Sequence, residues 1–263
     1  MTRTDAGTEV LFVFAHQDDE VGAAPWIERE VRDGNRVSCL YLTDGGSRTE
    51  PAVRDAESLR ALETLGVPPG SVAFLSDGER VRDNGLVRVL PRAFAALNAW
   101  VATNLPGVGR LYTLAWEGGH PDHDAAYVLT VALADARGIR DAWQFSLYNA
   151  RRCPRPLFRV LSQLPASGES RVIRYGLVDA IRYATICWRH TSQVRTWLGL
   201  FPELAIRRLL LRSESVVRID QARSRRRPHD GELLYERMFG TRYADVRTRT
   251  DEFLDGPQKA LPL

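Results

Sequence analysis

Residues 9–20 read EVLFVFAHQDDE and join an apolar run to a polar motif. The run, residues 9–15, is rich in Val and Phe and stops abruptly, as a buried strand of a parallel sheet does. The polar motif begins at His16 and carries three successive acids at positions 18–20. In an open α/β sheet, ligands bind beyond the carboxyl ends of the strands. We therefore look for chemistry at this junction.

Strands and helices are expected to alternate along the first 150 residues. Short apolar runs predict four more strands, over residues 36–42, 72–75, 110–114 and 143–148. Helical patterns with suitable ends predict helices over residues 23–33, 54–65, 91–103 and 123–137. Such alternation is typical of βαβ units, so we expect an α/β, Rossmann-like three-layer αβα fold with a mostly parallel sheet.

A second polar motif follows the fourth predicted strand. It reads WEGGHPDH at residues 116–123. It should lie at the same edge of the sheet as His16, because adjacent parallel strands are only about 5 Å apart. A catalytic zinc has three protein ligands from His, Asp or Glu and keeps a fourth position for water. His16 and Asp19, on a turn that enters a helix, can face one point, and His123 would complete the set. These ligands suit Zn²⁺, and also Fe²⁺ or another divalent metal.

Both motifs resemble those of a known enzyme family. AHQDDE, residues 15–20, is similar to the AHPDDE motif of the PIG-L/LmbE family of zinc-dependent N-deacetylases. HPDH, residues 120–123, matches that family's second motif letter for letter. Similar stretches around Arg54 and Asp83, and an H-x-S-Q stretch from His190, extend the resemblance. It implies a hydrolase that removes an N-acyl group, typically N-acetyl, from an amino sugar such as N-acetylglucosamine.

The resemblance also implies roles at the metal. His16, Asp19 and His123 would be the metal ligands. Asp18 would be the general base that takes a proton from a water whose pKa zinc lowers to about 7. The sequence departs from the motif at Gln17, which replaces Pro, so we expect a less rigid backbone there with the metal site intact.

Further residues are assigned from the same pattern. His120 would stabilise the developing oxyanion as an imidazolium, and Asp122 would hold His120 in its charged form. Arg54 and Asp83 are assigned to the substrate, as contacts to sugar hydroxyls or a phosphate. Gly118 stands where some family members carry a Tyr near the scissile carbonyl, which argues against a tyrosine-assisted step.

Structural interpretations compete with these roles. The acids at positions 18–20 could be residues of a helix start favoured by the helix dipole, and Pro121-Asp122 could be an ordinary helix start. Glu20 is interpreted in this way, as a residue that ties down the helix. Arg54 could be a solvated charge at the surface. The presence of both motifs in one chain favours the catalytic interpretation for the others.

Charge is distributed unevenly. Residues 1–150 hold 14 basic and 21 acidic residues, net −7, whereas residues 151–263 hold 22 and 12, net +10. Such a split can indicate a nucleic-acid or membrane surface. The arginines are spread out and no aromatic RNA-binding signature accompanies them. We therefore expect a solvated basic face that packs against the acidic first half or steers a small-molecule amino-sugar substrate toward it, and no nucleic-acid partner. The sequence leaves open whether the protein forms a homo-oligomer.

The remaining predictions concern organisation and location. Residues 1–150 are assigned to the Rossmann-like metal-binding catalytic core. Residues 151–263, mainly helical over 175–211 with an interruption at Pro202, are expected to be a mixed extension that completes the domain and caps the substrate cleft. No apolar run approaches the roughly 20 residues that span a bilayer, so we expect a cytoplasmic protein without a transmembrane segment.

Two other functions fit the same sequence. The chain could be a noncatalytic, metal-containing sugar-binding module on the same scaffold, although such a module needs no base beside a metal. It could also be an amidase that acts on a larger sugar conjugate, which the loops of the C-terminal part would select.

Overall fold

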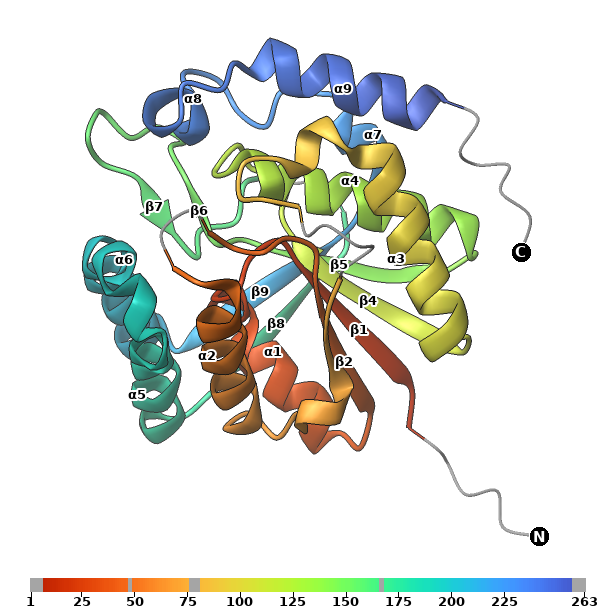
Figure 1. Ribbon diagram of the computed structural model, residues 1–263. Helices are drawn as coiled ribbons and strands as arrows, with labels where there is room; N and C mark the ends of the chain where they lie inside the picture. Colours follow the sequence, from red (N-terminus) through yellow and green to blue (C-terminus); the bar gives the residue numbers. More distant parts are fainter. Residues whose placement is uncertain (1–6, 47–48, 76–80, 166–167, 257–263) are drawn as a thin grey trace, which may run out of the picture.

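A seven-stranded sheet forms the centre of the molecule in the computed structural model, which describes residues 7–46, 49–75, 81–165 and 168–256 (Figure 1). Its strand order is β3-β2-β1-β4-β5-β9-β8. The strands are β1 (Glu9–Phe14), β2 (Arg36–Tyr41), β3 (Val72–Phe74), β4 (Val108–Leu114), β5 (Asp141–Phe145), β8 (Ser170–Arg174) and β9 (Ser213–Arg218). Strands β1 to β5 are parallel, and β9 runs antiparallel to both β5 and β8. The predicted α/β class with a mostly parallel sheet is confirmed.

Helices cover both faces of the sheet (Figure 1). One face carries α1 (Glu20–Arg32), α2 (Pro51–Glu63), α5 (Leu177–Thr185) and α6 (Val194–Ile206). The other carries α3 (Leu90–Asn104), α4 (Pro121–Ala136) and α9 (Tyr243–Asp255). The shorter elements are α7 (Gln221–Ser224), α8 (Leu234–Met238), the hairpin β6 (Tyr148–Asn149) and β7 (Arg159–Val160), the 3₁₀ turns η1 (Pro69–Ser71), η2 (Leu86–Arg88), η3 (Ile186–Arg189) and η4 (Thr191–Gln193), and the π-helical turn η5 (Arg207–Leu211).

Strand β1 lies at the centre of the parallel part of the sheet, between β2 and β4. Its residues from Val10 to Phe14 are completely buried, as the apolar run predicts. The rings of Phe12 and Tyr112, on neighbouring strands, stack with centroids 4.5 Å apart. Helix α1 begins at Glu20, three residues earlier than the predicted start at residue 23. The acidic motif is therefore part of the turn that enters α1.

The C-terminal part extends the same sheet through β9 and β8, next to β5. The expected interruption of the helical region at Pro202 is wrong, because Pro202 lies inside α6. The carbonyl that Pro202 leaves without a partner belongs to the exposed Leu198, while Leu200 and Leu204 pack into the core on the other side. The break falls instead at η3 and η4, around His190. No helix in the described ranges has both the length and the apolarity needed to cross a bilayer.

Candidate active site

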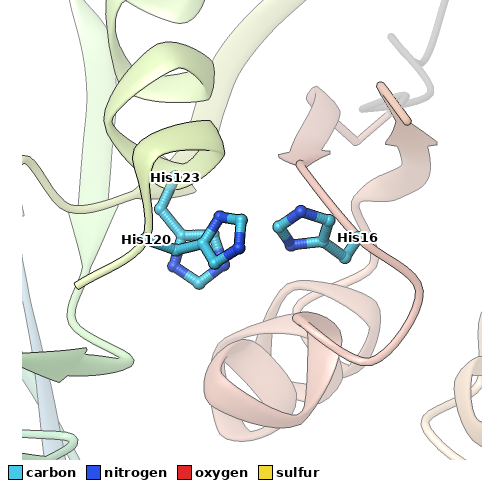
Figure 2. Close-up of side chains that lie close together, drawn as sticks. All are labelled: His16, His120 and His123. Atoms are coloured by element: carbon cyan, nitrogen blue, oxygen red, sulfur yellow. The ribbon is translucent and has the colours of Figure 1, made fainter. Parts of the chain in front are cut away.

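Three histidines from the two polar motifs meet at the carboxyl edge of the sheet (Figure 2). His16 follows β1, His120 caps the start of α4, and His123 lies in the first turn of that helix. One ring nitrogen from each lies within 4.8 Å of one from every other. All three are at most 6% exposed. The structure thus brings together the motifs that strand order predicts to be neighbours.

Asp19 links the first motif to the second. Its Oδ2 accepts the backbone N–H groups of Ala15 and His16, at 2.9 and 2.7 Å, and its Oδ1 lies 3.1 Å from Nε2 of His123. Burial alone would raise the pKa of Asp19, but the nearby His123 and His16 outweigh it and lower that pKa well below its usual range. The carboxylate is therefore fixed by the backbone through one oxygen and presents the other to the histidines.

Polar atoms without partners indicate that this cluster fits a metal ion. His123 is 1% exposed, yet its Nδ1 makes no hydrogen bond within the described part of the chain, and its Nε2 has only the ion-pair contact with Asp19. Buried polar groups are normally paired, and imidazole with carboxylate is a donor set that divalent metals bind. A second, overlapping group consists of His16, Asp83, His120 and Asp122. Either group offers enough donors to hold a divalent ion.

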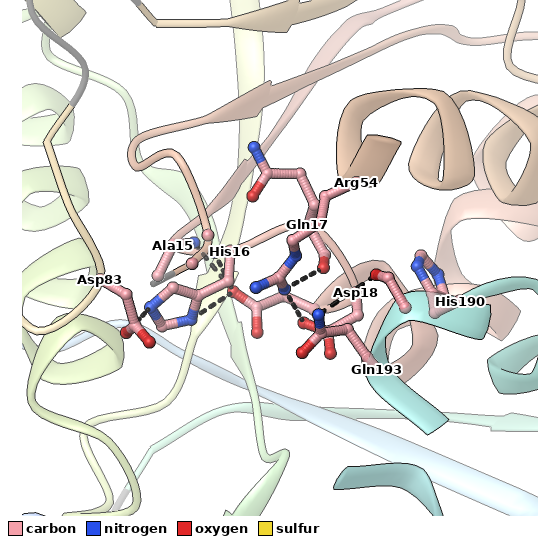
Figure 3. Close-up of polar contacts among 12 residues, drawn as sticks. Ala15, His16, Gln17, Asp18, Arg54, Asp83, His190 and Gln193 are labelled. Carbon is pink, nitrogen blue, oxygen red and sulfur yellow. Dashed lines mark hydrogen bonds and ion pairs between the residues drawn. The ribbon is translucent and has the colours of Figure 1, made fainter. Parts of the chain in front are cut away.

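Asp18 occupies a strained position beside these donors (Figure 3). Its φ of 133° is rare for a residue with a side chain, and such conformations typically cost about 1–3 kcal/mol. The backbone N–H of Asp18 donates to Oε2 of Glu20, which helps to hold that conformation. Burial raises the pKa of Asp18 to about 6, although Arg54, whose Nη2 lies 3.3 Å from Oδ1, opposes the rise. A carboxyl group of this kind can both take up and release a proton near neutral pH.

Arg54 is buried, so its interpretation as a solvated surface charge is wrong. Its Nη2 donates to the carbonyl of Gln17 at 2.5 Å. Gly45 makes this packing possible: its φ is +70°, and a Cβ there would lie 1.9 Å from Oε1 of Gln17 and 2.9 Å from Cζ of Arg54. The amide of Gln17 donates to Thr43 and Asp55, so hydrogen bonds restrain the turn that we expected to be less rigid.

The carboxylate of Asp122 faces His16, whereas we expected it to face His120. Its oxygens accept the backbone N–H groups of Asn84 and Leu86, at 2.7 and 3.0 Å, and Oδ2 lies 3.3 Å from Nε2 of His16. His120 instead accepts the backbone N–H of Asp122 at Nδ1. The side chain of Asp122 thus contacts His16 directly, while its charge acts to raise the pKa of His120, which burial lowers.

Asp83 is the carboxylate that reaches His120. Its Oδ1 lies 3.3 Å from Nε2 of His120 and 3.2 Å from Nε2 of His16. Burial lowers the pKa of His120, and Asp83 only partly offsets that effect. Burial therefore disfavours the imidazolium that the sequence predicts, and Asp83 lies within the donor cluster rather than outside it.

A buried contact that the sequence did not reveal joins α1 to the C-terminal part. Nε2 of His190 lies 3.1 Å from Oε1 of Glu20, and both side chains are fully buried. The neighbouring residues Thr191 and Ser192 donate to Glu57 on α2. The H-x-S-Q stretch is the signal that could have indicated this loop. Glu20 is thus structural, as expected, and its partner is His190.

Glu117 is a buried carboxylate to which the sequence analysis assigned no role. It accepts hydrogen bonds from a single loop, from the hydroxyl of Ser146, the backbone N–H groups of Leu147 and Tyr148, and the amide of Asn149. Burial raises its pKa, and these donors oppose the rise. The ring of Tyr148 lies with its centroid 5.2 Å from that of His123. Glu117 therefore fixes one wall of the cluster.

The region that contains both polar motifs is similar to known proteins. Residues 11–134 match the model of the PIG-L family, described as GlcNAc-PI de-N-acetylase. Two curated relatives are described as 1D-myo-inositol 2-acetamido-2-deoxy-alpha-D-glucopyranoside deacetylase. The one from Tsukamurella paurometabola is 33% identical over 163 residues, which cover 48% of this chain and 55% of the relative. The one from Kineococcus radiotolerans is 29% identical over 211 residues, and the match covers 64% of this chain and 58% of the relative. The chain thus spans little more than half the length of these relatives.

Solved structures share the fold at low identity. A mutant deacetylase of the teicoplanin biosynthetic pathway superposes with a TM-score of 0.59 at 18% identity, over 81% of this chain and 100% of the other. A conserved protein from Thermus thermophilus superposes with a TM-score of 0.57 at 19% identity, over 80% of this chain and 94% of the other. Both polar motifs, and the sheet edge where they meet, lie within residues 11–134, the region that matches the model of the PIG-L family.

Proposed function

We propose that this protein is a metal-dependent hydrolase that removes an N-acetyl group from an amino sugar or its glycoside. The family match and the names of the two curated relatives support this proposal. The observation that carries it is the difference between two adjacent carboxylates. Asp19 is bound by the backbone and faces His123, whereas Asp18 stands beside the cluster with a pKa raised by burial to about 6. One is suited to hold a cation, the other to move a proton.

His16, Asp19 and His123 would hold the ion, which we expect to be Zn²⁺, with Fe²⁺ or another divalent metal as alternatives. When bound, such an ion supplies a Lewis acid that activates water and polarises the amide carbonyl. The second donor group, which includes His120 and Asp83, overlaps this set at His16. The variant His123→Ala distinguishes the two sets, because His123 is absent from the second group.

Asp18 would carry the proton through the reaction. Its carboxylate accepts a proton from the water that attacks the amide carbon, and it returns that proton to the nitrogen as the C–N bond breaks, so the products are acetate and the free amine. Arg54 keeps Oδ1 of Asp18 in place by contacts at 3.3 Å to that oxygen and 2.5 Å to the carbonyl of Gln17. A carboxyl with a pKa near the working pH serves well in both steps.

His120 would stabilise the negative charge that develops on the carbonyl oxygen. Because its Nδ1 accepts the backbone N–H of Asp122, the ring proton resides on Nε2, which can donate to that oxygen as a neutral imidazole. Several expectations from the sequence stay predictions. They are the contacts of Arg54 and Asp83 with the sugar, the capping role of residues 151–263, the cytoplasmic location, the lack of a nucleic-acid partner and the oligomeric state.

The test is amine release from N-acetylglucosamine and its inositol glycoside, measured on metal-loaded protein. We expect the wild type to release amine and Asp18→Asn to lose about 10²- to 10⁴-fold in rate while it keeps its metal. The matched control is Asp33→Asn, which makes the same change at an exposed carboxylate. Metal-loaded protein that binds these sugars but releases no amine from any of them would favour the noncatalytic binding module instead.

A further inference from the structure

Large apolar side chains are exposed on α5, α6 and η5 of the C-terminal part. Seven of them each expose between 50% and 79% of their surface: Leu177, Val178, Ile181, Leu198, Ile206, Leu210 and Leu211. We call this set the apolar face. Single exposed apolar residues are common, but a cluster of this size on a soluble domain marks a surface that another body covers.

Each helix has two distinct sides. On α5, Leu177, Val178 and Ile181 are exposed while Tyr183 packs inward, and on α6 the exposed Leu198 and Ile206 alternate with inward residues such as Trp197 and Leu204. The end of η5 adjoins the start of α5, because the N–H of Tyr175 donates to the carbonyl of Arg212 at 3.1 Å. The exposed residues of the two helices therefore belong to one region of the surface.

The apolar face lies away from the layers of the domain. In Figure 1, α5 and α6 form the outermost elements on their side, beyond α2 as seen from the sheet. Nothing in the described ranges covers the seven residues, whose exposure is measured with all of those ranges in place. The inward sides of both helices already supply the contacts that attach them to the domain. The outward side is thus available to a partner.

The charges around this face are nearly all positive. Residues 174–212 contain seven arginines and two acids. The two acids are already engaged, Asp179 with Arg182 and Glu203 with Arg207. Four exposed arginines form no ion pair within the described part of the chain: Arg174, Arg189, Arg195 and Arg212. The face therefore combines exposed apolar side chains with unpaired guanidinium groups.

We propose that the apolar face docks this protein onto an anionic lipid membrane. Leucine-rich helices bordered by arginine bind at membrane interfaces by burying the apolar side in the headgroup region while the cations meet the lipid charge. A second copy of the chain fits the charges less well, because a symmetric dimer would bring two sets of unpaired arginines together. Helix α6 begins four residues after His190, so the docked surface adjoins the loop that contacts the catalytic motif.

The test is co-sedimentation with vesicles made of phosphatidylcholine alone or of equimolar phosphatidylcholine and phosphatidylglycerol. We expect the full chain to bind only the anionic vesicles. The double variant Leu198→Glu/Leu210→Glu should abolish binding, and Arg195→Gln/Arg212→Gln should weaken it about 25-fold, at about fivefold per arginine. Leu157→Glu, at an exposed leucine outside the face, is the matched control and should bind like the wild type.

Circular dichroism and amine release should be unchanged in all three variants, which separates loss of docking from loss of fold or of the proposed activity. Light scattering on the same samples should give the mass of a monomer. The proposal is overturned if the wild type does not bind anionic vesicles, if the leucine variant binds as well as the wild type does, or if light scattering shows a dimer that only the leucine variant disrupts.

Discussion

The contact between His190 and Glu20 should be essential for the stability of the first polar motif, residues 15–20. The change we consider is His190→Ala, which removes the imidazole 3.1 Å from Oε1 of Glu20 and leaves that carboxylate buried without its partner. The other oxygen of Glu20 accepts the N–H of Asp18. The substitution therefore acts on the fold directly and on the strained backbone of Asp18 through Glu20.

The magnitude follows from burial. At 3.1 Å and an effective dielectric constant of about 20, two unit charges attract by about 5 kcal/mol. Loss of one partner from a buried pair typically costs about 3–5 kcal/mol, because the remaining charge stays in the interior. We expect His190→Ala to lower the free energy of unfolding by this amount. Glu20→Gln/His190→Ala should cost less than the sum of the two single changes.

The effect should depend on pH. Burial lowers the pKa of His190, but Glu20 outweighs it and leaves that pKa above its ordinary value of 6.5. When folding raises the pKa of a histidine, its charged form stabilises the fold. This stabilisation is fully present at pH values below the pKa in the unfolded chain, and it is lost as the pH rises through the pKa in the folded protein. The difference between wild type and His190→Ala should therefore be larger at about pH 6 than at about pH 9.

Urea unfolding at both pH values is the assay, with His229→Ala as the control because that buried histidine contacts no carboxylate in the described ranges. A loss below about 1 kcal/mol for His190→Ala would refute the reasoning, since that is the range of an ordinary surface contact. Equal losses at the two pH values would show that His190 is neutral in the folded protein.

Three further predictions concern the walls of the cluster and the ion. Glu117→Ala should lower the free energy of unfolding by at least about 3 kcal/mol, because four donors lose their acceptor. Urea unfolding measures this loss, and a clearly smaller one would contradict the prediction. Gly45→Ala should lower Tm, since its Cβ would lie 1.9 Å from Oε1 of Gln17, and an unchanged Tm would contradict this packing. Chelation should lower Tm by removing a ligand of the native state alone, whereas an unchanged Tm would argue against a bound ion.

Much of the fold could be predicted from the sequence because most of the parallel strands are short, apolar and largely buried. The run from Val10 to Phe14 is completely buried, and its position at the centre of the parallel part of the sheet explains its uniform composition. Strand β8 is different: its residues alternate between intermediate and exposed, so it gives little hydrophobic signal. Its pairing with β9, and that of β9 with β5, depends on distant parts of the chain.

The site shows the same contrast. That His16 and His123 would be neighbours follows from strand order, which the local patterns reveal. The partners of Asp122 and His120 cannot be predicted from strand order. They depend on how the segment from Asp83 to Leu86 passes over the start of α4. The contact between Glu20 and His190 joins residues 170 positions apart, and no local pattern specifies it.

We propose that the two polar motifs form one metal site. The measurement is elemental analysis of purified wild type, His16→Ala, His123→Ala and the control His229→Ala. We predict about one divalent ion per chain in the wild type and the control, and almost none in the other two variants. A wild type that binds no ion when supplied with Zn²⁺ or Fe²⁺, or variants that keep a full equivalent, would contradict the claim.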